Sequence, residues 1–337
     1  MENLSHTLTG WALGEAGFKE RTRFANATLM IAANLPDLDV LVYATSTSPI
    51  SFRRGWTHGL LAQAILPLAL TAVMALVARL RPEKGAGLIF TNDEKKIGPA
   101  PFSIAWTLLL ACIGVESHVF LDFLNNYGVR LLAPFDWRWF YGDALFIADP
   151  WLWLTLGGGV WLAKRRREPQ PARVGVLVAA CYLAVMLTSA QAAREVVATT
   201  WTHTRGAAPK ALMVGPRPLT PFTRDVIVDA GDHYETGTFS WLDRTVSFDA
   251  TGTPKNAGNP AVKQAMRTPP IKAFLVWARF PFWVTLGERR GQQSFGTRVI
   301  VGDMRFAGFG PLKVVGDRAR FTASTVVPGT TETTKTK

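Results

Sequence analysis

Four apolar stretches, each close to the length of a bilayer crossing, constrain the fold of this chain more than any other feature. They lie at residues 57–78, 102–124, 144–163 and 174–190, and about 20 apolar residues suffice for a helix to span the hydrocarbon core. Cytoplasmic loops carry the excess of lysine and arginine, so we expect the loops 79–100 and 164–173 to face the cytoplasm. The sequence predicts a mainly α, multi-pass helical protein of the cell inner (plasma) membrane.

Two shorter apolar segments precede the first crossing, and a different kind of sequence follows the last. Residues 4–18 and 24–35 predict a hairpin of short helices, in which Gly10 and Gly14 allow close approach. From Trp201 onward, alternating segments are separated by turn residues, which is typical of strands. We therefore expect three parts: a helical transmembrane metal-site domain at 1–198, a β-rich soluble domain at 199–328 and a disordered tail at 329–337.

The formal net charge of +12 invites comparison with nucleic-acid-binding proteins. The basic residues, however, occur in short loop clusters such as 19–23 and 164–167, and are scattered through the C-terminal part. This distribution is typical of membrane-protein loops, so no nucleic-acid partner is expected.

The segment ESHVFLDFL at 116–124 places ionisable side chains at the end of an apolar stretch, where each is costly and commonly functional. His118 and Asp122 are four residues apart and share one face of a helix, whereas Glu116 points nearly the opposite way. An imidazole and a carboxylate on one face suit Zn²⁺ or another divalent metal, which needs three or four such ligands.

The remaining ligands are expected from the same, external side of the membrane. Residue 6 begins the first short helix, the LPDLD turn follows the second, and RRGWTH precedes the first long crossing. The predicted metal ligands, for one ion or for two ions sharing a carboxylate, are His6, Asp37, Asp39, His58, His118 and Asp122.

These motifs, taken in order, resemble the YdjM-like family of membrane-bound metal-dependent hydrolases over nearly the whole chain. The order of ligands is also similar to that of bacterial zinc-dependent phospholipase C. The likeness implies that Asp37 or Asp39, with His58, His118 and Asp122, holds one zinc ion, and that His6 and Asp122 help to hold another. No third metal set is found. The motifs that carry the resemblance are HTLTG, ANLPDLD, RRGWTH, SHVFLDFLNNYG, YGDALFIADPWLW and VGDMRF.

A metal-activated water would then hydrolyse an ester, and an interfacial site favours a phosphoester of a membrane lipid or a lipid-linked substrate. The candidate catalytic residues are Asp37, Asp39 and Asp143, and the planar fork of Arg54 is the candidate for binding a phosphate oxygen. We expect the metal site and the C-terminal domain on the external, periplasmic side.

Plainer interpretations stay open for each residue and for the function. His6 is a possible helix cap, and His118 with Asp122 a possible interhelical hydrogen bond. One of Asp37 and Asp39 is expected to be only a turn residue. A transporter, whose ionisable groups would line a path through both leaflets, and a non-catalytic membrane protein with a closed structural metal site are the alternative functions.

Overall fold

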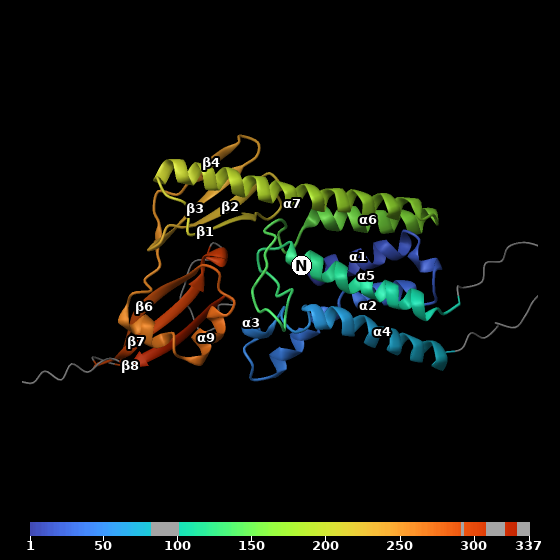
Figure 1. Ribbon diagram of the computed structural model, residues 1–337, viewed down its shortest axis with the longest axis horizontal. Helices are drawn as coiled ribbons and strands as arrows, with labels where there is room; N and C mark the ends of the chain where they lie inside the picture. The colour runs from blue at the N-terminus through green and yellow to red at the C-terminus, as the bar shows by residue number, and fades with distance from the viewer. Residues whose placement is uncertain (82–100, 291–292, 308–320, 329–337) are drawn as a thin grey trace, which may run out of the picture. The chain divides into compact units, whose positions relative to one another are not determined.

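The computed structural model describes residues 1–81, 101–290, 293–307 and 321–328 (Figure 1). Two compact units emerge. The first contains Met1–Leu41, Arg53–Ala190 and Gly215–Pro221, and the second contains Val42–Phe52, Gln191–Val214 and the residues from Phe222 onward. The predicted tail at 329–337 lies outside the described residues.

The first unit begins with the predicted hairpin. It consists of α1 (Asn3–Glu15), the 3-10 turn η1 (Phe18–Glu20) and α2 (Ala25–Ala32). A Cβ on Gly10 would lie 2.7 Å from the backbone oxygen of Leu29, so only glycine permits this close crossing. After α2 the chain tightens into a 3-10 helix, η2 (Leu35–Ala44), and bends by 49° relative to α2. The short helix α3 (Pro49–Phe52) follows and belongs to the second unit.

Four longer helices follow: α4 (Leu60–Leu80), α5 (Ile104–Phe123), α6 (Pro150–Arg166) and α7 (Gln170–Arg205). Among the described residues α4, α5 and α7 are each long and apolar enough to cross a membrane, and the bent pair of α2 and η2 would add a fourth such span. Three of the four predicted crossings therefore correspond to such helices.

The predicted crossing at 144–163 needs correction. The helix begins at Pro150, six residues later, because the Asp149 side chain accepts a hydrogen bond from the Leu152 amide at 2.9 Å and caps it. The resulting α6 has 17 residues and ends in a basic turn. In contrast, α7 extends past the predicted end at residue 190 to Arg205, because the polar residues there do not interrupt a helix.

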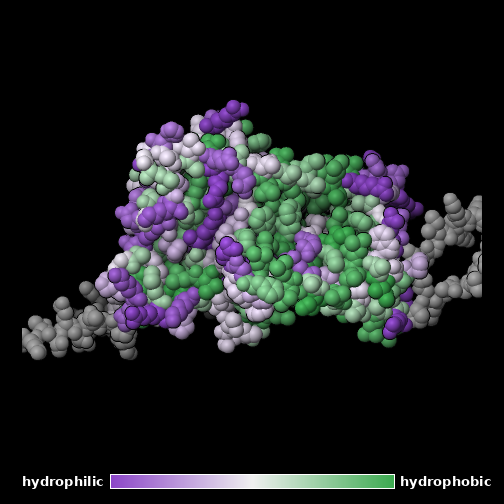
Figure 2. Space-filling model, viewed as in Figure 1, coloured by the Kyte–Doolittle hydropathy of each residue, from purple (hydrophilic) through white to green (hydrophobic). Residues whose placement is uncertain are grey.

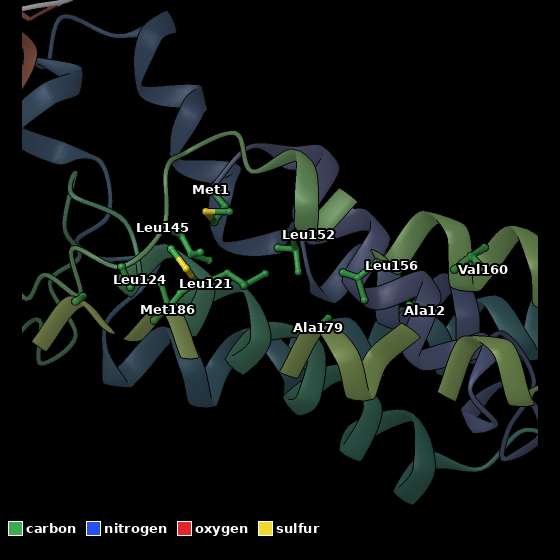
Figure 3. Close-up of a cluster of buried hydrophobic side chains, with 12 residues drawn as sticks. Met1, Ala12, Leu121, Leu124, Leu145, Leu152, Leu156, Val160, Ala179 and Met186 are labelled. Atoms are coloured by element: carbon green, nitrogen blue, oxygen red, sulfur yellow. The ribbon is translucent and has the colours of Figure 1, made fainter. Parts of the chain in front are cut away.

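α5 lies at the centre of this unit, in contact with α2 on one side and α4 on another, while α1 packs on α2 and α6. At Gly114 of α5 a Cβ would lie only 2.5 Å from the Ala32 Cβ, so these two helices touch through small residues. Figure 3 shows the buried cluster where α1, α5, α6 and α7 meet. Its members include Met1, Ala12, Leu121, Leu124, Leu145, Leu152, Leu156, Val160, Ala179 and Met186.

The outer surface of the helices is apolar as well, as the hydrophobic colour over the helical part in Figure 2 shows. Leu154 of α6 is 69% exposed and Val185 of α7 is 62% exposed. An apolar surface of this extent is typical of helices that face lipid.

The second unit is built on two sheets. The first contains β1 (Ala211–Pro216), β2 (Thr223–Asp229), β3 (His233–Ser240) and β4 (Thr245–Phe248) in that order, with β5 (Thr253–Pro254) also paired to β3. Alternate residues of β1 and β2 face opposite sides, as expected for strands. Leu212 and Val226 pack on the C-terminal half of α7 through Trp201, whereas Met213 and Ile227 pack in another cluster around Phe280.

The second sheet is an antiparallel meander of β6 (Pro281–Arg290), β7 (Gln293–Asp303) and β8 (Thr322–Pro328). Two short helices, α8 (Pro260–Ala265) and α9 (Pro269–Leu275), precede it, and the 3-10 turn η3 (Met304–Phe306) follows β7. A β-rich C-terminal part is thus confirmed. The proposed boundary between residues 198 and 199 stays a prediction, and it falls inside α7.

Candidate metal centre

Four side chains of the first unit each bring one ligand atom to within 4.8 Å of the others, and they are Asp37, His58, His118 and Asp122. Asp37 lies on η2, His58 in the turn before α4, and the other two on the last turns of α5. Asp37 is partly exposed, while the other three are buried. Segments up to 85 residues apart in sequence therefore supply one potential site, as expected for helix ends on one side.

The distances at the centre of this group suit one metal ion. His58 Nε2 lies 3.2 Å from His118 Nε2 and 3.2 Å from Asp122 Oδ2, and His118 Nε2 lies 3.6 Å from that same oxygen. Donors about 2.0 Å from a tetrahedral zinc ion lie roughly 3.3 Å from one another. Two imidazoles and two carboxylates are also a donor set that divalent metals accept.

Hydrogen bonds turn both imidazoles toward this point. His118 Nδ1 lies 2.8 Å from the Ala33 carbonyl oxygen, and since that oxygen only accepts, Nδ1 carries the proton and Nε2 presents its lone pair. His58 Nδ1 lies 2.9 Å from the Thr57 hydroxyl. Burial lowers the pKa of His58 below its ordinary value, although Asp122 opposes this shift, so its ring is neutral as a ligand requires.

Asp39 lies behind the centre rather than in it. Its Oδ2 accepts hydrogen bonds from the Arg54 amide at 2.7 Å and from the Thr57 hydroxyl at 3.4 Å, and Thr57 in turn contacts His58. A 3-10 helix has three residues per turn, so Asp37 and Asp39 point in different directions and only one of them reaches the central group. Asp39 therefore supports His58 through Thr57, as carboxylates behind metal ligands commonly do.

Arg53 joins the two aspartates of η2. Its Nε donates to Asp39 at 3.0 Å and its NH2 group donates to Asp37 at 3.1 Å, while 26% of its side chain stays exposed. Burial alone would lower the pKa of Arg53, but Asp39 and Asp37 raise it above its usual value. The guanidinium is therefore a permanent cation at the exposed side of the group.

Arg54, the predicted substrate-binding residue, is buried and faces inward. Its Nε lies 2.9 Å from Asp122 Oδ2 and its NH2 group donates to Oδ1 at 3.0 Å, while NH1 donates to the Asn125 side chain at 3.1 Å. The Met1 amine donates to the same Asp122 Oδ1. Arg54 also has a φ of 54°, an uncommon conformation for a residue with a side chain. Its position matches that of a partner for a metal ligand.

His6 lies against the group without being one of the four. Its ring stacks on His118 with centroids 3.8 Å apart, and its Nε2 is 3.5 Å from Asp122 Oδ1. Neither ring nitrogen has a hydrogen-bond partner among the residues that the structure describes, although the side chain is fully buried. Buried polar atoms are nearly always satisfied, so the two nitrogens of His6 are unusual, although Asp122 Oδ1 beside its Nε2 already accepts from the Met1 amine and Arg54.

Asp143, the remaining catalytic candidate, lies in the segment that runs back along the end of α5. The Gly142 amide donates to the Phe123 carbonyl at 2.7 Å, which holds Asp143 near the end of the helix that carries Asp122. Asp143 is buried and has a φ of 49°. It is not among the four clustered ligands, and its catalytic role stays a prediction.

Two polar residues of the centre were not identified from the sequence. Asn125 positions Arg54, and Thr57 links Asp39 to His58. A signal for Asn125 was present, because it lies three residues after Asp122 and so continues the same face. Thr57 showed no comparable signal, since its partner comes from a distant segment.

The comparison with known families agrees with the helical part of this description. A model of the YdjM inner membrane protein family matches residues 1–193, which include all six predicted ligands. No curated protein and no solved structure matches the chain. The match covers more than half of the chain, and three of its helices are apolar enough to cross a membrane. The chain therefore belongs to the YdjM inner membrane protein family.

Proposed function

We propose that this protein is a multi-pass membrane hydrolase that uses a divalent metal ion, most simply zinc, to activate water against an ester. The observation that carries the proposal is the convergence of two imidazole Nε2 atoms and Asp122 Oδ2 at mutual distances of 3.2 to 3.6 Å. These distances match the spacing of nitrogen and oxygen donors around a tetrahedral metal ion. A second ion held by His6 Nε2 and Asp122 Oδ1 would also satisfy the unpartnered Nε2 of His6, in competition with the Met1 amine and Arg54, which donate to that oxygen.

A divalent ion at such a site supplies Lewis acidity and lowers the pKa of water. The protein's own residues do the rest. His58, His118 and Asp122, all buried, would hold the ion together with Asp37, which is partly exposed. Arg53, whose side chain is partly exposed beside Asp37, is better placed than the buried Arg54 to meet the negative charge of a substrate.

The surroundings of Asp37 support a lipid substrate. The neighbouring residues of η2 expose apolar side chains: Leu38 is 49% exposed, Val40 48% and Leu41 66%. A helix with a carboxylate near the metal group and apolar residues outward suits the boundary between headgroups and acyl chains. We therefore propose a phosphoester of a membrane lipid or lipid-linked molecule as the substrate class, with the centre on the periplasmic side.

A structural metal site is the second candidate. Four protein donors are enough to complete a tetrahedral zinc site, and a closed site has no position for water. X-ray absorption spectroscopy of the metal-loaded protein separates the two functions. A catalytic site requires an oxygen ligand that is exchanged for a substrate-like phosphate, whereas a structural site keeps its ligands unchanged.

The decisive test uses the full-length protein purified in detergent. Metal content would be measured for the unaltered protein, for His58→Ala and His118→Ala, and for His203→Ala as a control, because His203 is an exposed histidine outside the centre. Hydrolysis of phospholipid vesicles and of a soluble phosphodiester would be followed with and without a chelator.

We expect bound metal and chelator-sensitive phospholipid hydrolysis in the unaltered protein and in the control, and loss of both in the two centre variants. A metal-free protein, or hydrolysis that persists in chelator, would overturn the proposal. Preference for the soluble diester would overturn the lipid substrate alone.

A further inference from the structure

The α6–α7 hairpin carries a groove far from any role assigned above. It has a volume of about 460 Å³, which is within the roughly 300–1,000 Å³ of small-molecule sites. Leu154, Leu162, Val174 and Val178 form most of its apolar wall. The helices touch at its floor, where a Cβ on Gly159 would lie 3.2 Å from the Gly175 Cα.

One end of the groove is polar and strongly basic. Arg166, Glu168 and Gln170 line this end, at the turn that joins the two helices. Lys164 and Arg165 at the end of α6, Arg167 in the turn and Arg173 in the first turn of α7 lie near it in sequence, so five cationic side chains accompany the single carboxylate of Glu168. Figure 2 shows a hydrophilic patch at this end of the hairpin, next to the apolar surface.

Several of these cations also contact the protein, which fixes the turn. Lys164 Nζ lies 4.7 Å from the Trp11 ring centre, Arg165 lies over Trp161, and Arg173 donates to the Ala16 carbonyl. Arg166 is exposed and lines the groove itself. It is therefore the cation best placed to meet a charged group at the mouth of the groove.

We propose that this groove binds one anionic glycerophospholipid, with an acyl chain along Leu154, Leu162, Val174 and Val178 and its phosphate at Arg166. Charge complementarity selects this occupant. An apolar channel that ends in a basic cluster matches a molecule with an apolar chain and an anionic head, and basic residues beside a membrane helix attract anionic lipid. The proposal does not rest on the metal centre or on hydrolysis.

Gly158 offers a variant that fills the groove without disturbing the fold. It lines the groove, and a Cβ built on it has no neighbouring atom within 4 Å. Gly158→Phe therefore adds a ring to the groove alone. Leu177→Phe is the matched control, because Leu177 is exposed on α7 but does not line the groove.

The charge of the headgroup is tested by Arg166→Glu. The matched control is Arg79→Glu, which makes the same change of charge on an exposed arginine of α4. Full-length protein would be exposed to equimolar phosphatidylglycerol and phosphatidylcholine in detergent. The lipid retained would be counted by native mass spectrometry, with thermal unfolding recorded for every variant.

We expect the unaltered protein to retain phosphatidylglycerol over phosphatidylcholine by at least about fivefold, the preference given by one cationic side chain. Arg166→Glu should abolish the preference, and Gly158→Phe should reduce retention of both lipids, while both controls behave like the unaltered protein. Equal retention of the two lipids by the unaltered protein would overturn the proposal, as would full retention by Gly158→Phe. A cross-linked dimer that Gly158→Phe disrupts would overturn it too, because a second copy would then fill the groove.

Discussion

Each compact unit buries an aspartate paired with an arginine through both carboxylate oxygens, yet the two pairs have different surroundings. In the helical unit Asp122 pairs with Arg54. In the C-terminal unit Asp303 pairs with Arg305, and the Nε and NH2 groups of Arg305 lie 2.9 and 3.0 Å from the two carboxylate oxygens of Asp303. Both arginines also lie over an aromatic ring, Tyr127 for Arg54 and Trp277 for Arg305.

The remaining partners distinguish them. Asp303 accepts three further hydrogen bonds, from the backbone amides of Arg279, Phe280 and Arg305. Burial alone would raise the pKa of Asp303, but Arg305 and these amides hold it below its usual value. Asp122 instead faces three imidazoles, two of which turn Nε2 toward one of its oxygens. A buried ion pair alone is therefore no sign of function, and the three imidazoles are what distinguish Asp122 from Asp303.

The largest expected effect is on the structural pair. Asp303→Ala leaves the Arg305 guanidinium buried without its counter-ion, which should lower the free energy of unfolding by about 3–5 kcal/mol. Asp243→Asn, at an exposed acid of the same unit, should change it by less than about 0.5 kcal/mol. Denaturant unfolding of both variants measures the difference. If Asp303→Ala lowered the metal content of protein that stays folded, the Asp303–Arg305 pair would not be purely structural.

Asp122→Asn tests the other pair. Asparagine has nearly the same shape but loses the charge and one acceptor. We therefore expect metal affinity to fall by more than about 100-fold, beyond the range typical of changes to residues that only support the ligands. Isothermal titration of the folded fraction with zinc gives the affinity. Unchanged affinity would mean that Asp122, like Asp303, serves only its arginine.

A smaller effect is expected at the residue behind the ligands. Asp39→Asn weakens the hydrogen bonds that orient Thr57 and the Arg54 amide, and should reduce metal affinity by about 10–100-fold. Asp37→Asn removes a ligand and should have the larger effect. If the order of the two variants were reversed, Asp39 would be the ligand and Asp37 the supporting residue.

The smallest effect concerns a surface cluster of the C-terminal unit. The hydrogen bond that His233 donates to Asp232, helped by one to Glu235, raises the pKa of His233 above its ordinary value, while Arg205 also pairs with Glu235. The folded state thus favours protonated His233. Protonated His233 therefore stabilises the folded state. This stabilisation is complete below about pH 6.5, the pKa of histidine in the unfolded chain, and is lost as the pH rises through the raised pKa of the folded state.

Because this cluster is exposed, its contribution should be only a few tenths of a kcal/mol. Unfolding followed from pH 6 to pH 8 should therefore show a slightly steeper loss of stability in the unaltered protein than in His233→Gln. His203→Gln is the control at another exposed histidine. If His233→Gln and His203→Gln had the same dependence of unfolding free energy on pH, groups other than His233 would be responsible for it.

Local sequence patterns were enough for much of the helical fold. The length of the apolar stretches predicts three of the four crossings and the first hairpin. Helical periodicity places His118 and Asp122 on one face of a helix. The stretch 274–286 has the aromatic and β-branched residues typical of strands, but only its second half is a strand. Two prolines at 269 and 270 start α9, which runs to Leu275, and the strand begins at Pro281.

The sequence by itself determined which residue types reach the metal centre, because a four-residue spacing on a helix and a run of apolar residues are local properties of the chain. The tertiary structure alone decided that Asp37 rather than Asp39 reaches the ligand group, that Arg54 faces Asp122 and that His6 stacks on His118. Those outcomes depend on distances between segments up to 112 residues apart in sequence, which are set by how helices pack and not by the periodicity of any one of them.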